Sequence, residues 1–137
     1  MRVLLLGSTG NVGSRLLAAL LAHGHNPIII VRNAAKLPQK LLRALPTSSI
    51  ITSPTLTEAV IRQALIEHDC GALINAAGLA SLLFKTEEFP ALVRTVGTAA
   101  AAVGRERGRP VRAWFLAGWA ALDVPWKKGK EGGMVMQ

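Results

Sequence analysis

The sequence is poor in cysteine and has no long apolar run. A single cysteine, Cys70, excludes an internal disulfide, and a chain without disulfides is compatible with a reducing compartment. The longest uncharged apolar stretch, residues 71–84, is interrupted by Asn75 and falls short of the ~20 residues that a membrane span needs. The apolar run after Arg2 stops at Gly7, which is too early for a signal peptide. We therefore expect a cytoplasmic protein that does not enter a membrane.

Charged residues are also scarce. They make up 18% of the 137 residues, half of which are apolar, and this composition predicts an ordered core rather than a disordered chain. The length suits one domain and is too short for a nucleotide domain followed by a substrate domain. An α/β core in which both faces of a sheet are covered fits these proportions.

Acidic residues are few. The chain has sixteen basic and eight acidic residues, which give a formal charge of +8. Four arginines gather around one expected turn, and three lysines lie in residues 127–130. The arginines are Arg105, Arg107, Arg109 and Arg112. No aromatic side chains alternate with these cations as stacking platforms for bases. The pattern therefore indicates solvated basic faces rather than a nucleic-acid interface, and a cofactor phosphate is the more economical use of one charge.

Apolar strands alternate with amphipathic helices along most of the chain. Residues 2–6 and 27–31 are short β-rich runs, and the helix expected over 11–23 ends beside Gly24, which suits a left-handed C-cap. Further strands are expected at 48–52, 71–75 and 111–117, and further helices at 34–45, 57–68 and 89–107. A hydroxyl of Thr55 or Thr57 is expected to cap the third helix. This alternation predicts a Rossmann-type doubly wound parallel sheet of about five strands.

The last residues differ from the rest of the chain. Residues 125–137 are rich in lysine and glycine and show neither a helical nor a strand period. We expect a flexible tail there, with residues 1–124 forming one folded domain.

A glycine-rich segment joins the first expected strand to the first expected helix. Gly7 permits a tight turn, Gly10 lets a phosphate approach the backbone, and Gly13 lets the helix pack close to the sheet. A pyrophosphate would lie on the free N–H groups at the helix N-terminus, where the helix dipole favours an anion. A second strand about 20 residues later favours a dinucleotide site over a simple turn. The residues expected to hold the dinucleotide are Gly7, Ser8, Thr9, Gly10, Asn11, Val12 and Gly13.

The residue after the second expected strand distinguishes NADP from NAD. An acidic side chain there would bond the adenosine ribose hydroxyls, but the segment reads Val31-Arg32-Asn33. Arg32 can make a bidentate contact with a 2′-phosphate, and Lys36 follows one helical turn later. We expect NADP in preference to NAD. The alternative is that Arg32 is an ordinary exposed charge at a strand end.

Four segments of the chain together resemble the short-chain dehydrogenase/reductase superfamily. They are residues 7–13, 31–33, 75–78 and 111–117. The glycine spacing GxxGxxG is similar to that of its extended and atypical branches, which include the NmrA-like NADP-binding proteins. The resemblance covers about residues 1–124 and implies an NAD(P)-binding Rossmann domain. It implies that Arg32 matches an arginine found after the second strand of NADP-binding members. It also implies that Ala76, Ala77 and Gly78 pass beside the adenine ribose.

Several features of the active reductases in that superfamily have no counterpart here. The resemblance implies a Tyr-x-x-x-Lys pair that protonates a carbonyl, but the sequence contains no tyrosine. It also implies a serine after the fifth strand, where residues 117–120 read Ala-Gly-Trp-Ala. Proton transfer to a developing alkoxide needs a donor within hydrogen-bonding reach, so the catalytic residues stay unassigned. The chain also stops before the family's substrate-binding region, which predicts a truncated form.

Three functional hypotheses follow. The first is an NADP(H)-binding protein of the atypical short-chain dehydrogenase/reductase type, with oxidoreductase activity on an unknown small molecule. The second is a non-catalytic module that senses NADP or docks a partner. The third is an inactive fragment that self-associates through an uncovered sheet edge. A metal site is not expected, because His23, His25 and His68 have no further ligands at metal-like spacing.

Overall fold

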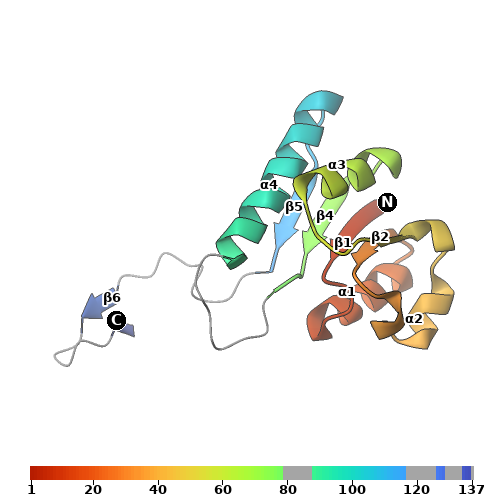
Figure 1. Ribbon diagram of the computed structural model, residues 1–137, viewed down its shortest axis with the longest axis horizontal. Coiled ribbons are helices and arrows are strands. Elements are labelled where there is room, and N and C mark those ends of the chain that lie inside the picture. The colour runs from red at the N-terminus through yellow and green to blue at the C-terminus, as the bar shows by residue number, and fades with distance from the viewer. Residues whose placement is uncertain (79–87, 117–125, 129–133, 137) are drawn as a thin grey trace.

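A five-stranded parallel sheet forms the centre of the structure, a computed structural model that describes residues 1–78, 88–116, 126–128 and 134–136 (Figure 1). The strands of this sheet are β1 (Arg2–Leu6), β2 (Asn26–Val31), β3 (Ile50–Thr52), β4 (Ala72–Asn75) and β5 (Arg112–Phe115). The helices are α1 (Asn11–Ala22), α2 (Gln39–Ala44), α3 (Glu58–Glu67) and α4 (Glu88–Arg107). Two 3-10 turns, Ala34–Lys36 and Thr47–Ser49, precede α2 and β3. The strands and helices alternate as the sequence predicts.

The order of the strands determines where loops gather. The sheet runs β3-β2-β1-β4-β5 and its neighbouring strands are parallel, with Leu4 of β1 opposite Ile28 of β2 and Leu73 of β4. The chain builds outward from β1 through β2 and β3, and then returns to the other side of β1 with β4 and β5. In open α/β sheets, ligands bind at the carboxyl ends of the strands where this reversal occurs. The predicted Rossmann-type fold is therefore confirmed.

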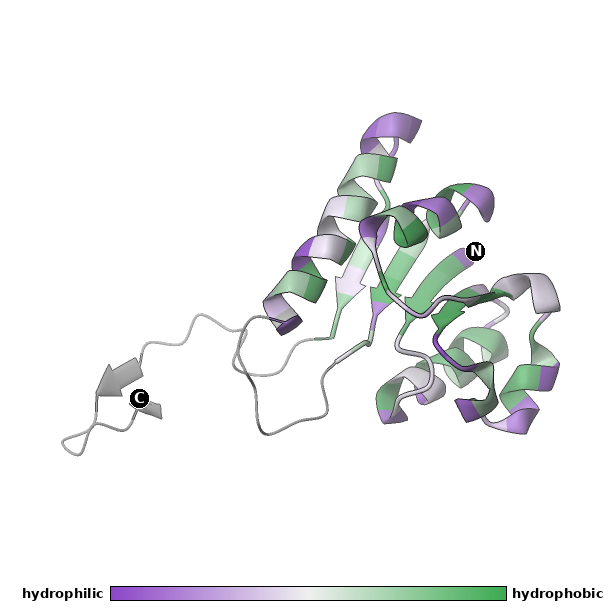
Figure 2. Ribbon diagram, viewed as in Figure 1, coloured by the Kyte–Doolittle hydropathy of each residue, from purple (hydrophilic) through white to green (hydrophobic). Residues whose placement is uncertain are grey.

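Each face of the sheet buries its own apolar core. Helices α1 and α2 lie on one face and α3 and α4 on the other, with the apolar strands between them (Figure 1, Figure 2). Alternate residues of β1 divide between the two cores, because Leu4 and Leu6 pack under α3 and α4 while Leu5 packs on the side of α1. Burying one large apolar side chain is worth about 1.5–3 kcal/mol relative to leaving it exposed. The apolar runs of the inner strands thus hold helices against both faces.

Local signals in the sequence set several helix ends. The Thr57 hydroxyl accepts the Val60 N–H at 3.3 Å and caps α3. Gly24 follows α1 with a φ of +71°, the left-handed conformation expected at a C-cap. Pro38 divides the helix predicted over 34–45, so that a 3-10 turn comes first and α2 begins after the proline.

The covering of the sheet is incomplete at β5, although the composition favours two covered faces. Phe115 packs against the core under α3 and α4. On the opposite face, the side chain of Trp114 is 50% exposed and that of Leu116 is 37% exposed. The reason is positional: α1 packs on β1 and β2, whereas β5 is the last strand of the sheet.

A second pair of strands lies near the end of the chain, where the sequence predicts a flexible tail. β6 (Trp126–Lys128) pairs antiparallel with β7 (Met134–Met136), and Lys127 lies opposite Val135. Strands of three residues are too short for an alternating pattern to be recognised in the sequence. The predicted boundary at residue 124 and the predicted strand end at Ala117 lie outside the described residues.

Candidate dinucleotide-binding site

The glycine loop joins β1 to α1 at the carboxyl edge of the sheet. Gly7 has a φ of +78°, which glycine adopts without steric cost, and its carbonyl oxygen accepts the Gly10 N–H at 3.1 Å. Gly10 is the extended N-cap of α1, and its own carbonyl accepts the Ser14 N–H at 2.9 Å. The tight turn therefore places the start of α1 beside the end of β1.

The three glycines of the loop differ in what surrounds them. A Cβ atom on Gly13 would lie 1.9 Å from the Gly7 carbonyl oxygen, so α1 can pack against the loop backbone only with glycine there. The sequence predicts that Gly13 lets the helix pack close to the sheet. In the structure, the closest neighbour of Gly13 is the backbone of the glycine loop. A Cβ atom on Gly10 would meet a single neighbour, the same Gly7 oxygen, at 3.3 Å. The missing side chain of Gly10 therefore leaves open surface at the start of the helix.

Hydrogen-bond donors at the start of α1 have no acceptor among the residues that the structure describes. The first amides of a helix have no acceptor within the helix, and Gly10 has no side chain that could cap them. No acidic residue lies in the first turn, and Asn11 and Val12 are exposed. The positive end of the helix dipole thus faces solvent, an arrangement that binds phosphate groups.

Ser8 adds an unsatisfied hydroxyl to the loop. The residue is buried, and its Oγ has no hydrogen-bond partner within the described part of the chain. A buried polar group without a partner costs about 1–3 kcal/mol, so such groups are rare in native structures without a ligand or water. The unpaired hydroxyl, the open surface at Gly10 and the free amides of α1 all suit a ligand rich in oxygen acceptors. A pyrophosphate has that chemistry.

The segment after β4 forms a second wall of the site. Asn75 is buried at 1% exposure, and its Oδ1 accepts the Ala77 N–H at 3.2 Å. The Ala76 N–H donates to the Leu6 carbonyl at 3.0 Å, which extends the pairing of β4 with β1 up to the glycine loop. The sequence predicts a role for residues 76–78 but does not predict that Asn75 positions them. The available signal was a polar side chain at the end of an apolar strand.

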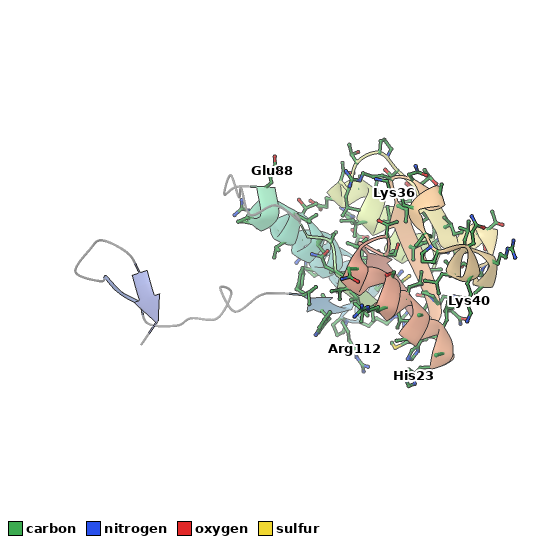
Figure 3. All side chains as sticks on the ribbon, turned by 90° about the horizontal axis from the view of Figure 1, so that it is seen from below. His23, Lys36, Lys40, Glu88 and Arg112 are labelled. Atoms are coloured by element: carbon green, nitrogen blue, oxygen red, sulfur yellow. The ribbon has the colours of Figure 1, made fainter. Side chains whose placement is uncertain are left out.

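Arg32 and Lys36 lie on the other side of β1. Arg32 directly follows β2, and its exposed side chain makes no ion pair or hydrogen bond with the residues that the structure describes. Asn33 Oδ1 accepts the Ala35 N–H at 2.9 Å and fixes the following 3-10 turn, which ends at the exposed Lys36 (Figure 3). Because β1 lies between β2 and β4, the glycine loop, Arg32 and residues 76–78 share one sheet edge.

The described residues of this edge can bind an anion, but they supply no recognisable proton donor for reduction. Residues 117–120, where the family's serine would lie, are outside the described residues. Cys70 is at the opposite edge, and burial raises the pKa of its thiol to about 11 against the partly opposing effects of Arg107 and Arg2. A thiol that stays neutral at physiological pH is a poor nucleophile.

Solved structures with this fold include much longer proteins. Gre2 from Candida albicans has a TM-score of 0.65 at 20% identity, over 90% of this chain and 38% of its own. UDP-glucose-4-epimerase from Stenotrophomonas maltophila, solved with bound NAD and formylated UDP-arabinopyranose, has a TM-score of 0.64 at 18% identity, over 91% and 39%. The oxidoreductase ylbE from Lactococcus lactis has a TM-score of 0.58 at 18% identity, over 90% and 51%. The chain thus spans about half the length of these structures or less, and at these identities the likeness shows the fold alone.

Three further comparisons concern curated sequences, membrane-spanning helices and metal sites. No curated protein sequence matches the chain. None of the helices that the structure describes is long and apolar enough to cross a membrane. Within the same residues, no three histidine, cysteine, aspartate or glutamate side chains gather as a metal ion would require.

A family comparison identifies the domain. The NAD(P)H-binding family matches residues 7–115, from the first glycine of the loop to the end of β5. This match covers most of the chain, and it confirms the NAD(P)-binding Rossmann domain that the resemblance implies. The chain belongs to the NAD(P)H-binding family.

Proposed function

We propose that the chain binds NADP(H) on its glycine loop, as a domain of the atypical, NmrA-like short-chain dehydrogenase/reductase type. The observation that carries the proposal is the meeting at one sheet edge of an open Gly10, an unpaired Ser8 hydroxyl and the free amides of α1. Asn11 and Val12 would donate their N–H groups to the pyrophosphate. Residues 76–78, held by Asn75, would border the adenosine. Bound NADP(H) supplies hydride transfer to a small-molecule substrate.

Arg32 supports the choice of NADP over NAD. Its guanidinium is exposed and lacks an ion-pair partner among the described residues, so a phosphate could contact it without displacing another group. A guanidinium presents paired N–H donors that match phosphate oxygens. Lys36, at the end of the next 3-10 turn, adds a second positive charge. The end of β2 carries no carboxylate that would repel a 2′-phosphate.

A second candidate function is NADP binding without catalysis. The observation that favours it is the absence of tyrosine from the 137 residues, together with a buried Cys70 at the far edge of the sheet. In that case the half-exposed face around Trp114 would serve to dock a partner or a second copy. We place either form in the cytoplasm, where a lone cysteine stays reduced.

Isothermal titration of the whole chain with NADPH and with NADH tests the proposal. We expect NADPH to bind more tightly than NADH. Arg32→Ala should weaken NADPH by about 1–3 kcal/mol and leave NADH nearly unchanged, because only NADPH carries the 2′-phosphate. Arg43→Ala is the matched control, since it removes an exposed arginine from α2 with the same change in charge.

Three outcomes would count against parts of the proposal. Equal losses for both cofactors in Arg32→Ala would contradict the assignment of Arg32. Equal losses in Arg32→Ala and Arg43→Ala would show a general effect of charge. Failure of the wild-type chain to bind either cofactor would contradict the proposed function. The two candidate functions are separated by turnover, because an oxidoreductase consumes NADPH in the presence of a carbonyl substrate and a sensor does not.

A further inference from the structure

A hollow of about 220 Å³ opens at the amino edge of the sheet, where β4 and β5 begin. Its walls include Cys70, Gly71, Arg107, Arg109, Val111 and Arg112, and we refer to it as the arginine hollow. The glycine loop lies at the other end of the sheet, because β1 runs from Arg2 to Leu6 between the two edges. Five residues of a strand span about 16 Å, so this hollow is separate from the candidate dinucleotide site.

Contacts within the protein fix two of the three arginines. Arg107 donates to the carbonyl oxygens of Cys70, at 2.9 Å, and of Leu65. Its guanidinium also lies 3.6 Å from the Asp69 carboxylate, to which Arg109 donates at 2.5 Å. Each guanidinium carries five N–H donors, so both keep donors free after these contacts.

Arg112 is the third cation of the arginine hollow. It is exposed at the start of β5, where Figure 3 labels it, and it makes no side-chain hydrogen bond or ion pair within the described residues. Within the described residues, the one carboxylate that contacts these guanidinium groups is that of Asp69, which pairs with Arg107 and Arg109. The three positive charges and one negative charge leave an excess of two positive charges at the hollow.

Two helix ends oppose this charge but do not cancel it. Helices α3 and α4 both end near the hollow, and a helix C-terminus carries roughly half a negative charge. Two ends thus contribute roughly one negative charge. Arg107 occupies the Leu65 and Cys70 carbonyls, and Arg2 adds positive charge near Cys70. Counted together, the three guanidinium groups, the Asp69 carboxylate and the two helix ends still leave a net positive charge at the hollow.

We propose that the arginine hollow binds a small phosphate dianion, either inorganic phosphate or the phosphate of a small monoester. Guanidinium groups pair with phosphate oxygens through parallel N–H donors, and the three cations outweigh the negative charge around them, which favours an anion. Val111 and Cys70 give part of the wall an apolar character, which suits the carbon portion of an ester. This site does not depend on dinucleotide binding at the glycine loop.

Titration of the ¹⁵N-labelled whole chain with inorganic phosphate, at constant ionic strength, tests the site by NMR. We expect saturable shifts at the amides of Cys70, Gly71 and Val111. Arg112→Gln should weaken this binding about tenfold, as expected for the loss of one charge-assisted contact, with the fold intact because the side chain is exposed. Arg43→Gln is the matched control and should bind like the wild type. Methyl phosphate in place of phosphate distinguishes the two sources, since tighter binding would indicate an ester.

Several results would overturn the proposal. They are the absence of saturable shifts at these amides, shifts confined to Asn11 and Val12 in the glycine loop, or equal affinity in Arg112→Gln and Arg43→Gln. Acetate that binds as tightly as phosphate would overturn the assignment of a dianion. If Arg112→Gln does not fold, Arg109→Gln tests the same prediction from the other rim of the hollow.

Discussion

A Cβ atom on Gly7 would lie 2.4 Å from the backbone nitrogen of Ala77, so the glycine loop and the segment after β4 touch through their backbones. Gly7 and Ala77 are 70 positions apart in the chain. Their contact is made possible by the strand order, which puts β1 beside β4, and by the left-handed conformation of Gly7. The candidate site is therefore a single structure assembled from two distant parts of the sequence.

The closest contact in the loop leads to a prediction about stability. Gly13→Ala should lower the free energy of unfolding by more than about 2 kcal/mol, because its Cβ would overlap the Gly7 carbonyl oxygen. Urea unfolding followed by circular dichroism measures this loss. Gly24→Ala, strained only by its φ of +71°, should cost about 1–2 kcal/mol. Gly78→Ala has no neighbour within 4 Å and should be nearly neutral. A Gly13→Ala chain as stable as Gly78→Ala would contradict the packing described here.

Gly10 should matter for the ligand more than for the fold. Gly10→Val should abolish the binding of NADPH and NADH, because a branched side chain would occupy the surface where the phosphates approach. The far-UV circular dichroism should remain that of the wild type, since the added Cβ meets one atom at 3.3 Å. Titration calorimetry measures the binding. Retained affinity would show that the loop is only a turn.

The two threonines before α3 should differ in importance. Thr57→Ala should destabilise the protein by about 1 kcal/mol, because it removes the hydroxyl that accepts the Val60 N–H. Thr55→Ala is the control, since within the described residues the side chain of Thr55 makes no hydrogen bond and its backbone carbonyl accepts one from the Ser53 hydroxyl. Thermal unfolding of the two variants side by side distinguishes them. Equal losses would mean that the cap contributes nothing specific.

Cys70 gives a prediction about pH. Burial raises the pKa of its thiol from 9.0 to about 11, so the unfolded chain loses this proton at lower pH than the folded chain. The stability that this difference provides is complete below pH 9 and is lost as the pH rises towards about 11. Urea unfolding should therefore show that the free energy of unfolding of the wild type falls across this pH range. The fall should be smaller for Cys70→Ala. Parallel curves for the two proteins would contradict it.

The exposed face of β5 gives a prediction about association. Trp114→Lys should reduce any concentration-dependent self-association seen by analytical ultracentrifugation, because it places a charge on a half-exposed apolar face at the sheet edge. The same variant should lose less stability than a change at a buried position, since Trp114 is 50% exposed. Phe115→Ser is the contrast, because Phe115 packs against the core and its loss should destabilise the fold. Association unchanged by Trp114→Lys would exclude this face as the interface.

The secondary-structure elements and the type of fold follow from local features of the sequence. Strand, turn and helix are specified by the apolar runs of β1 and β2 and by the three glycines between them. These signals act through local conformation, which depends on neighbouring residues. The caps at Thr57 and Gly24 and the interruption at Pro38 are local in the same way. The pairing of β6 with β7 was missed because three-residue strands carry no recognisable period.

Which distant residues meet became visible in the folded chain. It showed that Asn75 holds the second wall of the candidate site, that Ser8 has an unpaired hydroxyl, and that β5 is covered on one face. The sequence indicates a solvated basic face around Arg107, Arg109 and Arg112. In the structure, Arg107 and Arg109 share Asp69 beside a hollow, and Arg112 has no partner among the described residues. These facts depend on contacts between residues far apart in the chain. Such contacts are set by strand order and helix packing, which the spacing of residue types does not record.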